Sequence, residues 1–132
     1  MTFRPKRFDV AGKHPDEVWR AVSNISDMVK EIRAQLADRP ASEFREAGAW
    51  QVSKPLRFGD APDADVQRFL ARGVKIIDGL ESKLPLGLSQ GQREVRNRCA
   101  ELSKSMQHVL DRRADDQASG IRTHMDRERT GP

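Results

Sequence analysis

The chain has 132 residues, of which 36% are hydrophobic, 33% charged and 5% aromatic, with no tyrosine and one cysteine. This length fits one domain around a single core, and so few aromatic residues disfavour a β-sandwich. No run approaches the roughly 18 apolar residues of a membrane span, and no hydrophobic signal region opens the chain. We therefore expect a soluble, cytoplasmic, all-α protein: a bundle of three main helices, with one or two short extra helices and extended basic connections.

The formal net charge of +4 is concentrated in two places. One is the basic N-terminal arm, residues 1–14, and the other is the start of the last predicted helix, with Arg93, Arg96 and Arg98. Basic patches are typical of proteins that bind nucleic acid. We expect a phosphate-contacting surface at the last helix only if the arm folds beside it and the two clusters form one patch.

The first predicted helix covers residues 15–39. Its apolar residues recur at the spacing of one helical face: Val18, Val22, Ile25, Val29, Ile32 and Leu36. Pro15 suits the first turn, and the acidic residues Asp16 and Glu17 suit the positive end of the helix dipole. Pro40 is expected to end the helix, and residues 15–112 together are expected to form the bundle.

The middle segment, "ASEFREAGAWQVSKPLRFG", is expected to hold a short helix capped by Ser42 and ended by Gly48, followed by extended chain. Its aromatic residues Phe44 and Trp50 are expected to dock on the bundle and yet stay exposed enough to bind a protein. Exposed apolar side chains of this kind often dominate interfaces. The predicted protein-interface residues are Phe44, Trp50, Ile121 and Met125.

The second long helix is predicted over residues 63–84, with Asp60 and Asp63 spaced as a capping pair before it. Its apolar face carries Gly73, and Gly79 lies further along the helix. Glycine inside a helix costs about 1 kcal/mol relative to alanine, so both positions predict a close helix crossing.

The last helix begins with a capping-box pattern, Ser89 and Gln92, and places Cys99 on an inward apolar stripe. Carried to Glu128 it would be roughly 60 Å long at 1.5 Å per residue, more than the other helices could cover. We therefore expect the helix to break or fray between Asp115 and Gly120, and a polar C-terminal helix or tail over residues 113–132.

Two similar stretches, "RPKRFD" and "KPLRFGD", precede the first two long helices. In the favoured interpretation they are extended lead-ins whose phenylalanines, Phe8 and Phe58, cover the ends of the bundle. The alternative is that their cations contact phosphates while the phenylalanines stack on bases.

No catalytic or metal site is predicted. Cys99 lies on the inward stripe without a neighbouring histidine, so we expect a structural thiol. The histidines, His14, His108 and His124, lack the spacing of zinc ligands. We expect no enzyme activity, no metal and no cofactor.

Two functions fit these features. The first is a non-enzymatic accessory subunit of a nucleoprotein assembly, which meets protein subunits or its own copies and contacts the backbone of RNA or DNA without reading sequence. The predicted nucleic-acid-binding residues are Arg4, Lys6, Arg7, Lys54, Arg57, Arg93, Arg96 and Arg98. The alternative is a protein-binding adaptor, inhibitor or chaperone that has no nucleic-acid contact.

A compact, basic and helical chain without catalytic residues resembles the small helical subunits of multi-subunit CRISPR effector complexes. The resemblance lies in this overall character and in no diagnostic motif. It implies self-association along a filament and contact with guide or target nucleic acid.

Overall fold

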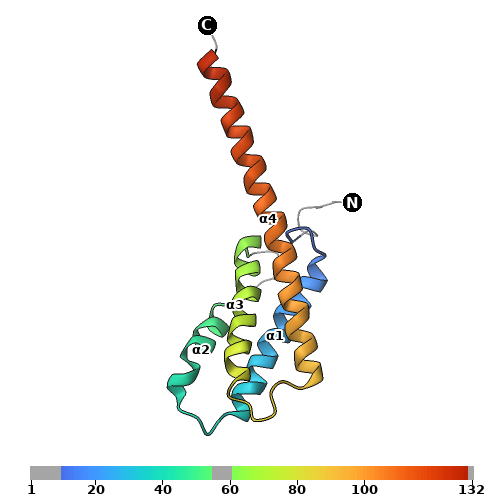
Figure 1. The fold of residues 1–132 in the computed structure, drawn as a ribbon, viewed down its shortest axis with the longest axis vertical. Helices are drawn as coiled ribbons and strands as arrows, with labels where there is room; N and C mark the ends of the chain where they lie inside the picture. Colours follow the sequence, from blue (N-terminus) through green and yellow to red (C-terminus); the bar gives the residue numbers. More distant parts are fainter. Residues whose placement is uncertain (1–9, 55–60, 131–132) are drawn as a thin grey trace, which may run out of the picture.

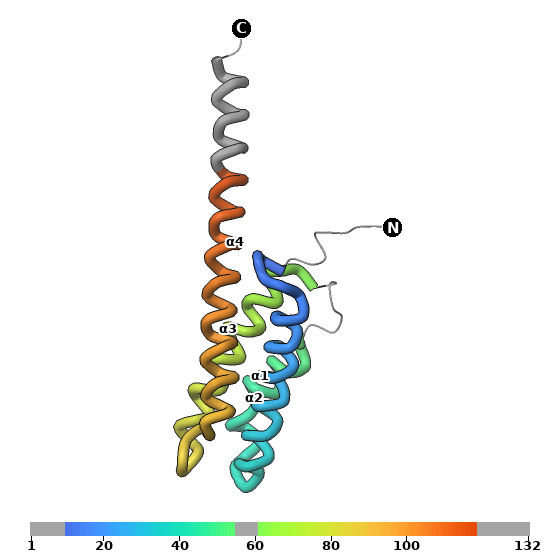
Figure 2. The backbone as a smooth tube through the Cα atoms, turned by 90° about the vertical axis from the view of Figure 1, so that its right-hand side faces the viewer, coloured from blue at the N-terminus to red at the C-terminus, as the bar shows by residue number. Residues whose placement is uncertain are grey.

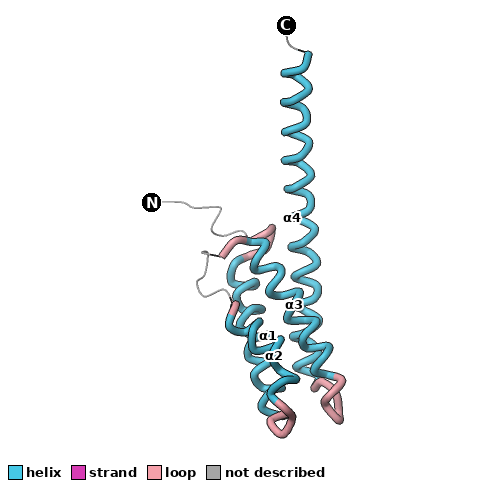
Figure 3. Tube along the Cα trace, turned by 90° about the vertical axis from the view of Figure 1, so that its left-hand side faces the viewer, coloured by secondary structure: helices cyan, strands magenta, loops and turns pink. Residues whose placement is uncertain are grey.

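The protein is an all-α bundle, as predicted. The computed structural model describes the backbone of residues 10–54 and 61–130, and the side chains of those up to Ala118. The helices are α1 (Pro15–Gln35), a short 3-10 helix η2 (Ala41–Phe44), α2 (Arg45–Val52), α3 (Asp63–Glu81) and α4 (Gln90–Thr130) (Figure 1). Short loops join them in the described part of the chain, where no strand occurs (Figure 3). None of the described helices is long and apolar enough to cross a membrane.

The core lies between α1, α3 and the first half of α4 (Figure 2). The apolar stripe predicted on α1 is buried, with Val18, Val22, Ile25 and Ile32 fully covered. Burying one such aliphatic side chain stabilises the fold by about 1.5–3 kcal/mol, so this stripe accounts for the position of α1. On α4, Cys99, Leu102 and Met106 face the same core.

Two of the three long helices begin as predicted, and α1 has Pro15 at its start with Asp16 and Glu17 in its first turn. His14 caps α1 by accepting a hydrogen bond from the Asp16 backbone N–H at 3.2 Å. Ser89 and Gln92 form the predicted capping box, in which each backbone N–H donates to the other side chain, at 2.9 and 3.2 Å. The capping role predicted for Asp63 is wrong, because Pro62 is the N-cap of α3 and no described side chain makes a capping hydrogen bond there. Asp60, its predicted partner, lies outside the described residues.

The middle segment differs from its prediction. Ser42 makes no capping hydrogen bond, and the chain stays helical through Gly48 to Val52. The expectation that Phe44 and Trp50 are exposed is also wrong, because their relative exposures are 8% and 1%. Both side chains belong to the core and are not available as interface residues in this chain.

Trp50 is buried because α3 offers it a space beside Gly73. The indole stacks on Phe69 with ring centroids 4.3 Å apart, and its Nε1–H donates to the Phe69 carbonyl at 2.8 Å. A Cβ atom on Gly73 would lie 2.5 Å from Trp50 Cζ2 and 2.9 Å from Ile25 Cδ1. The close crossing predicted at Gly73 is confirmed, whereas Gly79 has no such neighbour within 4 Å.

The predicted break in the last helix is wrong. Helix α4 continues from Gln90 to Thr130, 41 residues, beside helices of 21 and 19 residues (Figure 1). At 1.5 Å per residue α4 measures about 60 Å, roughly twice the length of α1. Its second half therefore projects beyond the bundle (Figure 3), and residues 111–118 are all exposed.

The contact at Gly73 predicts opposite effects of two glycine substitutions. Gly73→Ala should lower the free energy of unfolding by about 1–3 kcal/mol, because the new methyl group overlaps the indole. Gly79→Ala, in the same helix, should raise it by up to about 1 kcal/mol through helix propensity. Urea unfolding followed by circular dichroism measures both, and equal effects of the two substitutions would contradict the packing described.

Candidate functional site

The exit end of the bundle is the end from which α4 projects, formed by the Val10–Lys13 turn, the start of α3 and residues 109–113 of α4. Asp63 joins all three parts. Its Oδ2 accepts a hydrogen bond from the Ala11 backbone N–H at 3.0 Å and pairs with Arg113 Nη1 at 3.1 Å. One carboxylate therefore holds the base of the N-terminal arm and the point where α4 leaves the bundle.

The Val10–Lys13 turn is built for close contact with α4. Val10 and Lys13 exchange two backbone hydrogen bonds, of 2.9 and 3.0 Å, around Ala11 and Gly12 with φ angles of 47° and 80°. A Cβ atom on Gly12 would lie 3.1 Å from Val109 Cγ2, so only a residue without a side chain fits here unchanged. Ala11 is fully buried, and its left-handed conformation is held by the bond to Asp63.

Both basic connections of the chain therefore join the bundle at the exit end. The arm enters at Val10, and the second connection reaches the bundle at Ala61, just before Asp63. Lys54, at the end of α2, is half-buried. Several predicted residues lie outside the described residues: Arg4, Lys6, Arg7, Phe8, Arg57 and Phe58. The same applies to the side chains of Ile121, His124 and Met125.

Two of the three cations at the start of α4 form ion pairs with carboxylates of α3. Arg96 forms a two-pronged pair with Asp78, with Nε and Nη2 each 2.9 Å from a carboxylate oxygen. This hydrogen bonding lowers the pKa of Asp78 and raises that of Arg96. Arg93 lies 3.4 Å from Glu81, while Arg98 is exposed and makes no ion pair with the described residues.

The base of the basic arm and the cluster of Arg93, Arg96 and Arg98 lie at opposite ends of the packed half of α4. The base of the arm contacts Val109, whereas the other cluster begins at Arg93, about 24 Å away at 1.5 Å per residue. The described residues therefore do not form the single patch on which a phosphate surface at Arg93, Arg96 and Arg98 depends. Arg4, Lys6 and Arg7 of the arm lie outside the described residues, so a phosphate-contacting surface that joins the two clusters stays a prediction.

Cys99 is a structural residue, as predicted. It is 1% exposed, its Sγ lies 3.6 Å from the Ala21 carbonyl, and burial raises its thiol pKa to about 11. A thiol with that pKa stays protonated at neutral pH and is a poor nucleophile. His108 is exposed on the outside of α4. In the described part of the chain, no three histidine, cysteine or acidic residues lie together as metal ligands.

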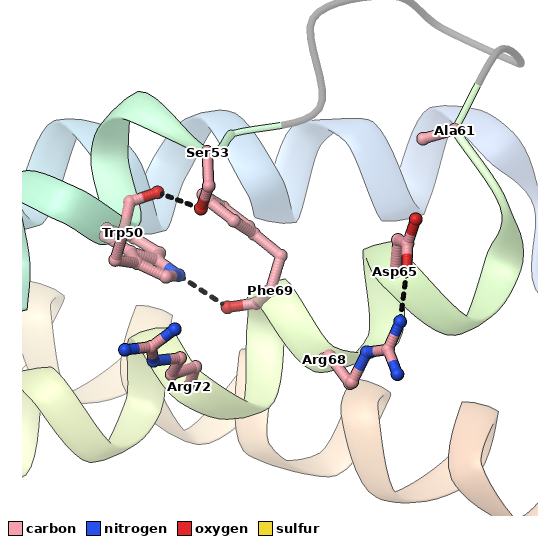
Figure 4. A pocket seen from close by; sticks show the side chains of 7 residues that line it. All are labelled: Trp50, Ser53, Ala61, Asp65, Arg68, Phe69 and Arg72. Atoms are coloured by element: carbon pink, nitrogen blue, oxygen red, sulfur yellow. Dashed lines mark hydrogen bonds and ion pairs between the residues drawn. The ribbon is translucent and has the colours of Figure 1, made fainter.

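A pocket between α2 and α3 is lined in part by Trp50, one of the predicted interface residues (Figure 4). Trp50 and Phe69 line its inner wall, and the arginines Arg68 and Arg72 stand at its side on α3. Arg68 pairs with Asp65, and Arg72 lies 3.9 Å from Glu46. These two arginines were not among the predicted site residues, although they stand four residues apart on one face of α3.

Comparison with protein-family models, with curated proteins and with solved structures finds no significant match. The resemblance to CRISPR small subunits therefore stays a prediction.

The Asp78–Arg96 pair predicts a pH-dependent contribution to stability. Because the folded-state pKa of Asp78 is lowered, the contribution is present above the ordinary carboxyl pKa and is lost as pH falls below about 4. Asp78→Asn should lower the free energy of unfolding at pH 7 by less than about 1 kcal/mol, since the pair is partly exposed. Thermal unfolding from pH 7 to pH 3 should show this difference shrink.

The exposed Asp27 provides the control for that measurement. Asp27→Asn should unfold like the parent protein across the same pH range. A deficit of Asp78→Asn that persists unchanged at pH 3 would contradict the assigned role of the ion pair.

Proposed function

We propose that this chain is a non-enzymatic accessory subunit of a larger assembly, and that a protein partner binds the projecting half of α4, residues 114–130. The observation that supports this proposal is the mismatch in helix length. Helix α4 has 41 residues, whereas α1 and α3, which cover it, have 21 and 19. More than a third of α4 therefore lies where the described bundle offers it no packing surface.

A helix of this kind gains stability when something packs against it. An isolated helix shorter than about 12–15 residues is marginal in water, and a projection of roughly 17 residues is little better. In the sequence, Ala114, Ala118, Ile121 and Met125 continue the apolar stripe of α4 at helical spacing. A partner helix laid along this stripe would bury it by the helix-in-groove mode of recognition.

The small residues at the base of the stripe favour a close approach. Ala114 and Ala118 are exposed, and their small side chains allow the backbone of a partner helix to come close. They are also the stripe positions nearest to the rigid bundle, and so the least mobile part of the proposed surface. Substitutions there change the surface without removing a contact of the folded bundle.

A pair of charge-matched variants tests the proposal. Ala114→Lys with Ala118→Lys adds two positive charges on the stripe, and Asp116→Lys makes the same change in net charge on the opposite side of the helix. Affinity capture from the native host extract, with quantitative mass spectrometry, should recover a specific partner with the parent chain and with Asp116→Lys. The double variant should lose that partner by at least about tenfold, the equivalent of 1.4 kcal/mol.

Equal recovery of that partner by both variants would contradict a role for the stripe. Sedimentation equilibrium of the purified chains shows whether the partner is a second copy, because self-association would then be lost in the double variant alone.

A second candidate function is contact with the backbone of nucleic acid. The observation that favours it is that both basic connections join the bundle at the exit end, through Val10 and Ala61. Arg4, Lys6, Arg7 and Arg57 belong to these connections. Arg93 and Arg96 support it less, because ion pairs with α3 already occupy their guanidinium groups.

The salt dependence of binding tests this second function. Fluorescence polarisation with single-stranded and duplex oligonucleotides between roughly 50 and 200 mM salt should give affinities that fall steeply as salt rises. Replacing Arg4, Lys6 and Arg7 together by alanine should lower the slope of log affinity against log salt by about 2–3. Replacing Arg93 and Arg96 by alanine should lower it less. Absence of binding at the lowest salt would contradict this function.

A further inference from the structure

A hollow at the corner between α1 and η2 is lined by three cations. This corner hollow has a volume of about 360 Å³, and its cations are Lys30, Arg33 and Arg39. The remaining lining residues carry no charge: Ala34, Ala37, Ala41 and Phe44. A concave surface that presents cations without a lining carboxylate is suited to an anion.

Arg33 is fixed in position at the hollow. Its Nη1 donates to Gln51 Oε1 at 2.6 Å, and its Cζ lies 5.9 Å from the centroid of the Phe44 ring. Gln51 is fixed in turn, because its Nε2 donates to the Ser26 carbonyl at 3.1 Å. A guanidinium carries five N–H donors, so the bond to Gln51 leaves the others for a ligand while holding the plane of the group.

The one carboxylate among the described residues that forms an ion pair with a cation of the hollow does not neutralise it. Glu43 lies 3.5 Å from Arg39 and 3.4 Å from Lys83, so it is shared by two cations. The side chain of Arg39 is 42% exposed, and a pair of this kind contributes only about 0–1 kcal/mol, which a stronger ligand can replace. Lys30 is exposed and makes no ion pair with the described residues. The corner therefore keeps an excess of positive charge.

We propose that the corner hollow binds a phosphate group. Arg33 supplies the planar, two-pronged donor that matches phosphate oxygens, and Lys30 and Arg39 supply the balancing charge. The phosphate belongs either to a free phosphorylated molecule or to a nucleic-acid backbone, because both present the same oxygens. This site lies at the opposite end of α1 from the exit end and does not rest on the role of α4.

Titration of the full chain with inorganic pyrophosphate at low ionic strength tests the site, followed by ¹H–¹⁵N NMR including the arginine Nε signals. Saturable shifts are expected at Arg33 and its neighbours. Lys30→Gln with Arg39→Gln should weaken binding at least tenfold, and Arg33→Lys should also weaken it because the fork is lost. The control, Arg20→Gln with Lys75→Gln, removes the same charge from exposed positions on α1 and α3 and should change affinity less than about twofold.

The titration can overturn the proposed phosphate site in two ways. Absence of saturable binding, or an equal loss in the control variant, would overturn it. The Lys30 and Arg39 variant leaves the Arg33–Gln51 bond in place, and an unchanged amide spectrum elsewhere verifies its fold. A short oligonucleotide distinguishes the two sources of phosphate. Displacement of pyrophosphate by the oligonucleotide assigns the site to a nucleic-acid backbone, and pyrophosphate binding without displacement assigns it to free phosphorylated molecules.

Discussion

The packing of Trp50 against Gly73 is the contact that brings α1, α2 and α3 together. The indole stacks on Phe69, donates to its carbonyl and fills the space that a side chain on α3 would take. This fixes α2 against α3, and Ile25 of α1 meets the same glycine. The next residue, Gln51, is thereby placed to bond α1 and Arg33. The phosphate site proposed at the corner hollow thus depends on a tryptophan that does not touch it.

At the exit end, Asp63 has a comparable role on a smaller scale. It holds the arm and α4 together, and beyond Arg113 the helix continues without cover from the described bundle. The fold thus consists of a packed unit and a projecting element. An accessory subunit that binds a partner through α4 uses both, because the packed unit anchors a helix that would be marginal in isolation.

The sequence predicted most of the architecture because helical apolar stripes are local patterns. The stripes on α1 and α4 and the Ser89–Gln92 capping box were predicted from spacing, and the close crossing at Gly73 from a glycine inside a helix. The course of α2 was missed, because Gly48 reads locally as a helix end and only the burial of Trp50 carries the helix past it.

The candidate sites were less predictable, since they combine elements far apart in the chain. A count of charges along the sequence does not identify Arg33, because its position is fixed by Gln51 on another helix. The ion pairs of Arg93 and Arg96 likewise depend on α3.

The claim that the outer half of α4 has no packing partner within the chain is tested most directly by hydrogen exchange of the isolated monomer. Amides of residues 93–113 should be protected, and those of 114–130 should exchange close to the rate of an unfolded chain. Equal protection in both halves would contradict it.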